Sequence, residues 1–397
     1  MKKRILVIGP GMQVGGVERS LLGLLNAIDP EIADIDLFLF EHQGEFMKYL
    51  PEHINLLPED RLLALSKWPI VKLFLRGHFF TGAMRLAAKT FSTVASKITD
   101  IPNVNTHRCN KWLMPFIKKQ QKKYDLALGF FGPHFYLIEK VSALKKYGWV
   151  HTDYSSPYAG VNKSFEEPMW SKLDRIICVS DACRFAFIGV FPDLADKVAV
   201  IENILDPALV RRQAEELSVS DEMPDDGSMR ILSIGRFCKA KAFDEAVPAC
   251  RKLIDEGYNI RWYIIGYGPD ESLIRSLIRT YELQERFIIL GKKTNPYPYI
   301  QACDLYAQPS RYEGKAVAVR EAQILGKPVL ITDFETSNSQ LDNGVDGHIC
   351  PMGVEGIVKG IKHMLDNPDL MRRIAENASK RDYGNVEEAA KLLNLTE

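Results

Sequence analysis

Short apolar stretches alternate with helical patterns along the chain, and this alternation limits the fold more than any other feature. In the first half we expect strands at Ile5–Ile8, Ile35–Phe40, Asp125–Gly129, Lys146–His151, Arg175–Val179 and Lys197–Ile201. In the second half we expect them at Arg230–Ile234, Trp262–Ile265, Phe287–Leu290, Leu305–Ala307 and Val329–Thr332. Strand and helix alternate in both halves, so the pattern predicts an α/β protein with two doubly wound parallel sheets.

A length of 397 residues fits two domains, and residues 218–228 (SVSDEMPDDGS) have the composition of a linker. We place an N-terminal domain at 1–205 and a C-terminal domain at 206–375. A helical segment at 376–397 is expected to pack back toward the N-terminal domain. Ligands of such sheets bind outside the carboxyl ends of the strands, so two facing sheets would create an interdomain cleft.

The composition excludes few classes of protein. Lys and Arg total 51, as do Asp and Glu, so net charge indicates no partner. The seven cysteines are scattered without a CxxC pair, which favours reduced thiols in the cytoplasm and argues against a zinc site. No run of eighteen apolar residues is present, so we expect no membrane-spanning helix.

The loop after the first strand reads GPGMQVGGV and resembles a dinucleotide-binding turn. That fingerprint needs glycine where this chain has Val14, which disfavours an NAD-dependent enzyme. Gly15 and Gly16 stand at the start of a helix, where a backbone without Cβ atoms admits a close ligand and the helix N-terminus favours an anion. Taken alone, the loop is explained slightly better by an ordinary strand-to-helix turn.

Loops after three strands of the second half carry similar features. Arg236 and Lys241 follow the first of these strands, and a guanidinium with an ammonium group suits a pyrophosphate. Gly266 and Gly268 form a compact turn after the next strand, and the Lys292–Thr294 backbone follows a third. Each feature alone is also typical of a solvated surface or a tight turn.

The stretch RYEGKAVAVREAQILGKPVLITD, residues 311–333, combines two carboxylates with a helix start. Glu313 precedes a helix expected over about Ala316–Leu325, and Glu321 lies inside it. Backbone N–H groups at the helix start suit a phosphate, and a carboxylate accepts hydrogen bonds from two adjacent hydroxyls. The pair therefore predicts a site for a sugar and a ribose. The N–H donors expected to face the phosphate, after Gly314, belong to Lys315, Ala316 and Val317.

The order of these motifs resembles the retaining glycosyltransferase family 4, of GT-B fold. The resemblance covers nearly the whole chain and includes the double glycine, GWVHTDY, DRIICVS, VIENILD, GRFCKAKAFDEA, IIGYGPDESL, the stretch with two glutamates and QLDNGVDGHIC. It implies two Rossmann-like domains that face a cleft. It also implies that Arg236 and Lys241 bind the donor diphosphate, Glu321 the ribose and Glu313 the transferred sugar, with His151 beside the sugar near the reaction centre.

The family implies retention of anomeric configuration without a metal or another cofactor, with a UDP-sugar as donor. The transferred group would be a hexose or an N-acetylhexosamine, and the acceptor a saccharide hydroxyl in exopolysaccharide, capsule or lipopolysaccharide synthesis. Three positions depart from the family pattern. Lys315 replaces an apolar or aromatic residue, Ala242 replaces a glycine, and FETSNSQLDNG replaces a GGxxE turn. The last change leaves the sugar undefined.

Residues 61–124 hold thirteen Lys or Arg and one acid, Asp100, together with seven Phe or Trp side chains. Basic segments with aromatic residues suit an anionic bilayer, and a solvated helix over core aromatics explains the composition equally well. Nucleic acid would give the same charge signal, but no recognition motif accompanies it. A lipid-linked saccharide acceptor at the cytoplasmic face of a membrane is the corresponding hypothesis.

Two further readings share the fold. A UDP-sugar 2-epimerase would need an acid cluster around the sugar, which the sequence lacks. A non-catalytic partner protein would not need to retain Glu313, Glu321, Arg236 and Lys241 together.

Overall fold

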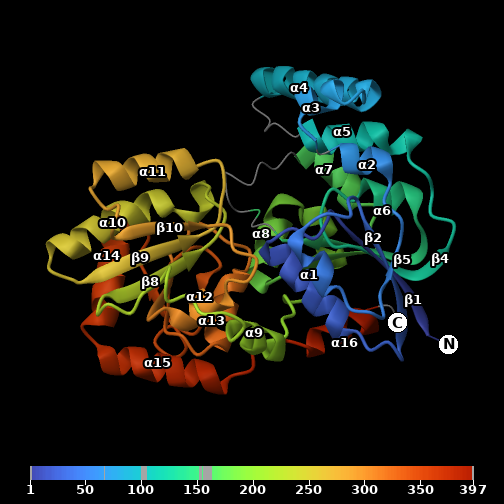
Figure 1. The fold of residues 1–397 in the computed structure, drawn as a ribbon. Coiled ribbons are helices and arrows are strands. Elements are labelled where there is room, and N and C mark those ends of the chain that lie inside the picture. The colour runs from blue at the N-terminus through green and yellow to red at the C-terminus, as the bar shows by residue number, and fades with distance from the viewer. Residues whose placement is uncertain (1, 67, 100–104, 152–153, 155–162, 396–397) are drawn as a thin grey trace. The chain divides into compact units, whose positions relative to one another are not determined.

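The computed structural model describes residues 2–66, 68–99, 105–151, 154 and 163–395. The chain forms two compact units (Figure 1). The N-terminal unit comprises Met1–Ile204 and Val386–Glu397, and the C-terminal unit comprises Leu205–Asn385. Of the basic segment, Lys67, Asp100 and the side chain of Lys97 lie outside the described residues.

The N-terminal unit contains a seven-stranded sheet in the order β3-β2-β1-β4-β5-β6-β7, whose neighbouring strands pair in parallel. Its strands are β1 (Lys3–Gly9), β2 (Ala33–Leu39), β3 (Asn55–Leu56), β4 (Lys123–Gly129), β5 (Ser142–Val150), β6 (Arg175–Cys178) and β7 (Val198–Val200). Its helices are α1 (Gly16–Ala27), α2 (Arg61–Leu65), α3 (Ile70–Leu75), α4 (Phe79–Thr99), α5 (Asn105–Leu113), α6 (Phe135–Lys140), α7 (Lys163–Trp170), α8 (Asp181–Val190) and α16 (Glu387–Asn394).

The C-terminal unit contains a six-stranded sheet in the order β10-β9-β8-β11-β12-β13, again with parallel pairings. Its strands are β8 (Met229–Ile234), β9 (Ile260–Ile265), β10 (Phe287–Gly291), β11 (Leu305–Gln308), β12 (Val329–Thr332) and β13 (His348–Cys350). Its helices are α9 (Pro207–Ala214), α10 (Phe243–Asp255), α11 (Glu271–Thr280), α12 (Tyr297–Ala302), α13 (Val317–Ile324), α14 (Gly353–Leu365) and α15 (Pro368–Lys380).

Both faces of the second sheet are buried, because successive side chains of a strand point to opposite faces. In β9, Trp262 and Ile264 join the core that contains α10, whereas Tyr263 and Ile265 join the core that contains α13. The two doubly wound parallel sheets that the sequence predicts are thus confirmed.

The linker composition at 218–228 does not mark the boundary between the units. The division falls between Ile204 and Leu205, and the acidic segment belongs to the C-terminal unit. Val219 and Met223 are 7% and 1% exposed and pack in the same core as Val210 of α9. Two buried apolar side chains thus anchor a stretch whose polar residues are typical of a linker.

Helix α15 still belongs to the C-terminal unit, and the chain returns to the N-terminal unit at Val386. Ile374 of α15 is buried in the core of the C-terminal unit. In α16, by contrast, Leu392 is buried in the core of the N-terminal unit. The hydroxyl of Tyr147 donates to the Leu395 carbonyl at 2.6 Å and fixes the end of this segment.

Candidate functional site

The order of the second sheet reverses between β8 and β11, which are neighbours although β9 and β10 lie between them in sequence. Loops that leave two such strands diverge to opposite faces, and ligands of doubly wound sheets bind in the space they open. The β8–α10 loop carries Arg236 and Lys241, and the β11–α13 loop carries Glu313. The sequence-predicted cations and first carboxylate therefore lie at the switch point.

The β8–α10 loop presents its two cations differently. Arg236 is exposed and forms no hydrogen bond or ion pair with another described residue. The Lys241 side chain is 18% exposed and runs across Gly235, where a Cβ atom would come within 2.9 Å of Lys241 Cδ and Cε. Gly235 thus leaves room for the aliphatic part of Lys241, which directs the ammonium group toward β11.

Ala242 adopts a left-handed conformation, with φ 52° and ψ 33°, immediately before α10. Glycine adopts this conformation without steric cost, and alanine does not. The residue is fully buried, so the surrounding core holds it there. The family pattern has a glycine at this position because the loop needs a left-handed residue. In this chain Ala242 adopts that conformation at a cost in strain.

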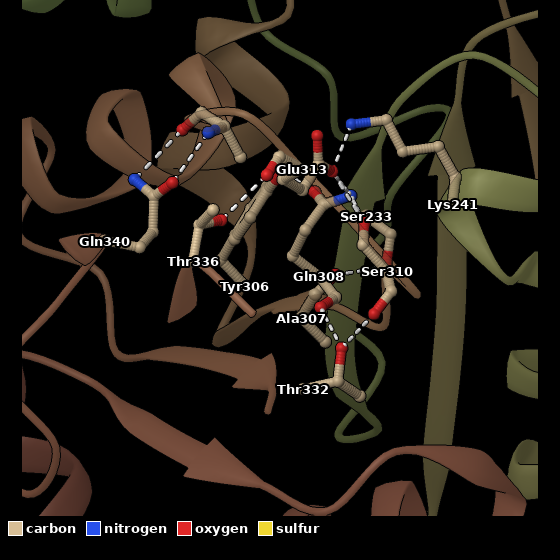
Figure 2. Close-up of polar contacts among 11 residues, drawn as sticks. Ser233, Lys241, Tyr306, Ala307, Gln308, Ser310, Glu313, Thr332, Thr336 and Gln340 are labelled. Carbon is tan, nitrogen blue, oxygen red and sulfur yellow. Dashed lines mark hydrogen bonds and ion pairs between the residues drawn. The ribbon is translucent and has the colours of Figure 1, made fainter. Parts of the chain in front are cut away.

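Glu313 lies in a hydrogen-bonded network that Figure 2 shows. Its carboxylate pairs with Lys241 and accepts hydrogen bonds from Ser310 Oγ at 2.6 Å and Gln308 Nε2 at 3.4 Å. Gln308 in turn accepts from the Tyr306 hydroxyl at 2.7 Å. Because Ser310 and Gln308 come from β11 or the loop that follows it, and Lys241 from the β8–α10 loop, the loops of two neighbouring strands set the position of the carboxylate.

Arg311 links the two loops and was not singled out from the sequence. Its guanidinium contacts Asp244 at 2.8 Å and Glu245 at 2.6 Å, and its backbone N–H donates to the Ala240 carbonyl at 2.7 Å. The hydrogen bond to Asp244, with further contributions from both carboxylates, raises the pKa of Arg311 above its ordinary value. The sequence signal that could have indicated this contact is an Arg two residues before Glu313, together with two acids in the first turn of α10.

Glu321 lies in α13 and is fully buried. It accepts a hydrogen bond from the Tyr297 hydroxyl at 2.9 Å. Burial, followed by the charges of Glu321 and Glu313, raises the pKa of Tyr306 well above its ordinary value. Because it is fully buried, Glu321 is no part of a solvated helix face.

The start of α13 differs from the prediction of free N–H groups. The Ala316 N–H donates to Gln340 Oε1 at 2.6 Å, and Gln340 Nε2 donates to the Ala316 carbonyl at 3.3 Å. Gly314 is buried, and Lys315 and Val317 are each 8% exposed. A phosphate that uses the Ala316 N–H would have to displace the Gln340 side chain.

Gly266 and Gly268 have a structural explanation that needs no ligand. A Cβ atom on Gly266 would collide with the Gly235 carbonyl, and one on Gly268 would lie 2.7 Å from the Phe237 nitrogen. The β9–α11 turn therefore supports the β8–α10 loop by direct backbone approach. Lys292, after β10, lies 5.4 Å from the ring centroid of Tyr267 in that same turn.

In the N-terminal unit, Gly15 and Gly16 lie at the start of α1, at the end of the loop that follows β1. Gly15 is extended, with φ −168°, and the Glu18 carboxylate occupies the position that a Cβ atom on Gly15 would need. A carboxylate from the first turn thus already lies at this helix start, where negative charge is favoured.

His151 follows β5 and donates from Nε2 to the Phe130 carbonyl at 2.9 Å. Burial lowers its pKa to about 4, so the ring is neutral at pH 7 with Nδ1 as the acceptor nitrogen. His134, which was not singled out from the sequence, is a second histidine of this unit and is 2% exposed. Burial lowers the pKa of His134 to about 3, and its ring packs against the paired glycines Gly129 and Gly148.

Residues 216–381 match the family model described as glycosyl transferases group 1. A relative from Campylobacter jejuni, N-acetylgalactosamine-N,N'-diacetylbacillosaminyl-diphospho-undecaprenol 4-alpha-N-acetylgalactosaminyltransferase, is 25% identical over 223 residues, 55% of this chain and 58% of the relative. The putative colanic acid biosynthesis glycosyltransferase WcaL of Salmonella typhimurium is 26% identical over 265 residues, 61% of this chain and 60% of the relative. The matched regions thus span about 60% of the length of these curated relatives.

Among solved structures, Anabaena Alr3699/HepE in complex with UDP-glucose has a TM-score of 0.70 and 16% sequence identity. The similarity covers 99% of both chains. It extends the resemblance from the matched region to the whole fold, and the chain has the GT-B fold that its sequence predicts.

Proposed function

We propose that this chain is a glycosyltransferase that moves a sugar from a nucleoside diphosphate to a saccharide hydroxyl. The match of residues 216–381 to the family model of glycosyl transferases group 1 supports the proposal. One observation carries the proposal: Arg236, Lys241 and Glu313 lie on the two loops that leave the switch point of the C-terminal sheet, with Glu321 on the helix that follows. Cations and a helix start suit a diphosphate, and two carboxylates suit two sets of hydroxyls.

In this proposal Arg236 and Lys241 bind the diphosphate, Glu321 the ribose and Glu313 the hydroxyls of a hexose or N-acetylhexosamine. Glu321 is suited to a ribose because a buried carboxylate can accept from two adjacent hydroxyls in a fixed geometry. The bound donor in the Anabaena structure supports UDP over GDP as the nucleotide. The proposed donor-binding set also includes Gly15, Gly16, Gly266, Gly268, Lys292, Gly314, Lys315, Ala316 and Val317. Ala316 belongs to it by its place at the start of α13, since its N–H is bound by Gln340.

We propose retention of configuration without a metal. The bond between the anomeric carbon and the diphosphate oxygen breaks while the acceptor oxygen bonds to the same face, and the acceptor proton passes to the departing phosphate oxygen. Arg236, Lys241 and the helix dipole of α13 offset the charge of the leaving group, while Gln340 stays bound to the Ala316 N–H. His151, neutral and with Nδ1 as an acceptor, orients a substrate hydroxyl rather than taking a proton.

The acceptor we propose is a lipid-linked saccharide in the synthesis of a surface polysaccharide, on the cytoplasmic side of the membrane. The names of the two relatives support this class, since one contains a diphospho-undecaprenol acceptor and the other colanic acid biosynthesis. No helix in the described part of the chain is long and apolar enough to cross a membrane. In this proposal the enzyme reaches the acceptor by binding at the membrane surface.

Helices α3 and α4 supply a surface suited to this role. We define the α3–α4 face by its exposed large apolar side chains, all of them between 47% and 81% exposed: Val71, Leu75, Phe79, Phe80, Leu86, Phe91 and Val94. The exposed cations Lys72, Arg76 and Lys89 lie among them, and the sequence has no acid from Arg61 to Lys97. Apolar side chains among cations fit an anionic lipid surface. Lys122 belongs elsewhere, since it pairs with Asp36 at 2.9 Å.

Calorimetry with UDP- and GDP-sugars tests the donor, followed by an assay for sugar release with the tightest binder. We expect one UDP-sugar to bind and to be hydrolysed slowly without an acceptor. Absence of binding by every UDP- and GDP-sugar would refute the proposal.

A further inference from the structure

Three side chains contact the backbone around Glu313 at regular intervals. Thr332, Thr336 and Gln340 lie four residues apart, and their partners Ser310, Glu313 and Ala316 lie three residues apart. Thr332 Oγ1 donates to the Ser310 carbonyl, Thr336 Oγ1 donates to the Glu313 carbonyl at 2.7 Å, and Gln340 contacts both the N–H and the carbonyl of Ala316. Figure 2 shows all three contacts, and we call these three side chains the clasp.

The clasp binds the main chain of Glu313, whereas the network in Figure 2 binds its side-chain carboxylate. Ser310 and Lys241 bind the side chain, whereas Thr336 binds the main-chain carbonyl of the same residue. Glu313 is thus fixed at both ends, by donors that come from β8–α10, from β11 and from the segment after β12. The two ends together set where the carboxylate lies.

Burial makes each contact of the clasp costly to lose. Thr332, Thr336 and Gln340 are 0%, 2% and 3% exposed, so water does not replace a missing hydroxyl or amide. Removal of one donor would leave a buried carbonyl without its partner, and the loop would have to move to satisfy it.

We infer that Thr336 and Gln340 are positioning residues that set the place of Glu313, and thereby the selectivity and rate of sugar transfer. The inference rests on the proposed function, because it concerns the same donor site. These two residues belong to FETSNSQLDNG, the segment that departs from the family turn. The chain replaces a glycine-rich backbone turn by side chains that clamp the loop, so the position of Glu313 depends on those side chains.

The test compares isosteric and conservative changes at one position. Thr336→Val keeps the shape and removes the hydroxyl, whereas Thr336→Ser restores the hydroxyl. With UDP-glucose and UDP-N-acetylglucosamine as probes, we expect Thr336→Val to lower kcat at least tenfold with UDP affinity within twofold, and Thr336→Ser to recover most of the activity. Asn338→Ala is the control, since this exposed side chain in the same turn bonds no other described residue.

A folded Thr336→Val enzyme with unchanged kcat would overturn the inference, as would an equal loss of UDP affinity and kcat. Amide hydrogen exchange of residues 313–316 gives a readout that does not need catalysis. We expect faster exchange there in Thr336→Val and Gln340→Leu, and wild-type exchange in Asn338→Ala. If wild type turns over no nucleotide sugar, the proposed function fails, and unchanged exchange in both clasp variants would separately reject positioning.

Discussion

Lys241 and Glu313 form an ion pair with each other, although the sequence assigned them to the diphosphate and the sugar of one ligand. Their side chains are 18% and 11% exposed, so the pair is largely shielded from solvent. A diphosphate that binds Lys241 must therefore draw the ammonium group away from a carboxylate. Without a ligand, each charged group is the partner of the other. When the donor binds, the diphosphate would become the partner of Lys241 and the sugar hydroxyls the partner of Glu313.

The first prediction concerns Glu313→Gln. Loss of the negative charge removes the competitor for Lys241, so affinity for free UDP should rise a few-fold, the equivalent of about 1 kcal/mol. Turnover of the UDP-sugar should fall, because a carboxylate no longer holds the sugar hydroxyls as positive charge develops at the anomeric carbon. Calorimetry with UDP and a kcat measurement decide it. Weaker UDP binding would place Glu313 on the nucleotide instead.

Glu321→Gln should behave in the opposite way. A contact with the ribose is equal in the ground and transition states, so its loss should weaken both UDP and UDP-sugar and mainly raise KM. Tyr297→Phe is a matched control, because it removes the hydrogen bond to Glu321 but leaves the carboxylate. We expect the control to change UDP affinity less than Glu321→Gln. Equal UDP affinity in Glu321→Gln and wild type would show that Glu321 does not bind the ribose.

The central strands of both sheets could be predicted because each is an apolar stretch buried on both faces. The observed strands β1, β8 and β12 agree with the expected ones to within two residues at each end. The strands β3 and β13 were missed. They have two and three residues and lie at sheet edges. Such a strand is defined by its pairing with one neighbour, and it is too short to show as an apolar run in the sequence.

Candidate site residues can be read from the sequence where a residue type carries its own chemistry, and the structure places two of them, Glu313 and Lys241, on loops at the switch point of the C-terminal sheet. The Lys241–Glu313 pair itself could not be predicted, because it depends on the contact between two loops 72 residues apart in the chain. Arg311 and Gln340 were missed for the same reason. Their partners are acids and backbone groups of other segments, and such long-range contacts leave no local pattern.

Arg236→Ala should weaken UDP without loss of stability. The side chain is exposed and bonds no other described residue, so its removal disturbs no contact. A charge-assisted hydrogen bond to the diphosphate is worth about 1.5–3 kcal/mol, which is roughly a tenfold to hundredfold loss of affinity. Arg279→Ala is the control, because this exposed Arg lies in the last turn of α11. Equal UDP affinity in both variants would place the phosphates elsewhere.

The stability of the N-terminal unit should depend on pH through His134 and His151. Burial lowers their pKa values to about 3 and about 4, from an ordinary 6.5. Between pH 6.5 and about 4 the unfolded chain binds protons that the folded chain does not. Stability should therefore be complete above pH 6.5 and fall as pH decreases, by about 1.4 kcal/mol per pH unit for each histidine.

Denaturant unfolding at pH 7.5 and pH 5 measures this slope. His134→Gln should reduce the slope, whatever it does to stability at pH 7.5. Trp170→Phe is the control, since it alters the aromatic ring that packs on His134 and keeps the imidazole. The control should be less stable at both pH values with the wild-type slope. An unchanged slope in His134→Gln would show that His134 is not the buried neutral group.

The α3–α4 face should bind anionic vesicles through its apolar side chains as well as its charges. Leu75 and Phe79 are 81% and 64% exposed, so Leu75→Gln with Phe79→Gln should not destabilise the fold. Full burial of such a side chain contributes about 1.5–3 kcal/mol, so the double variant should lose at least tenfold in vesicle affinity. Flotation with phosphatidylglycerol and phosphatidylcholine vesicles, at low and high salt, measures it.

The matched control is Leu144→Gln with Phe185→Gln, because these side chains are 77% and 63% exposed but belong to β5 and α8. Wild type and control should float with anionic vesicles at low salt and less at high salt, since charge attraction is screened. The α3–α4 variant should remain in solution while it still binds and hydrolyses the UDP-sugar. If wild type and both double variants float alike, these helices do not contact the membrane. If none floats, the acceptor is reached without a lipid surface.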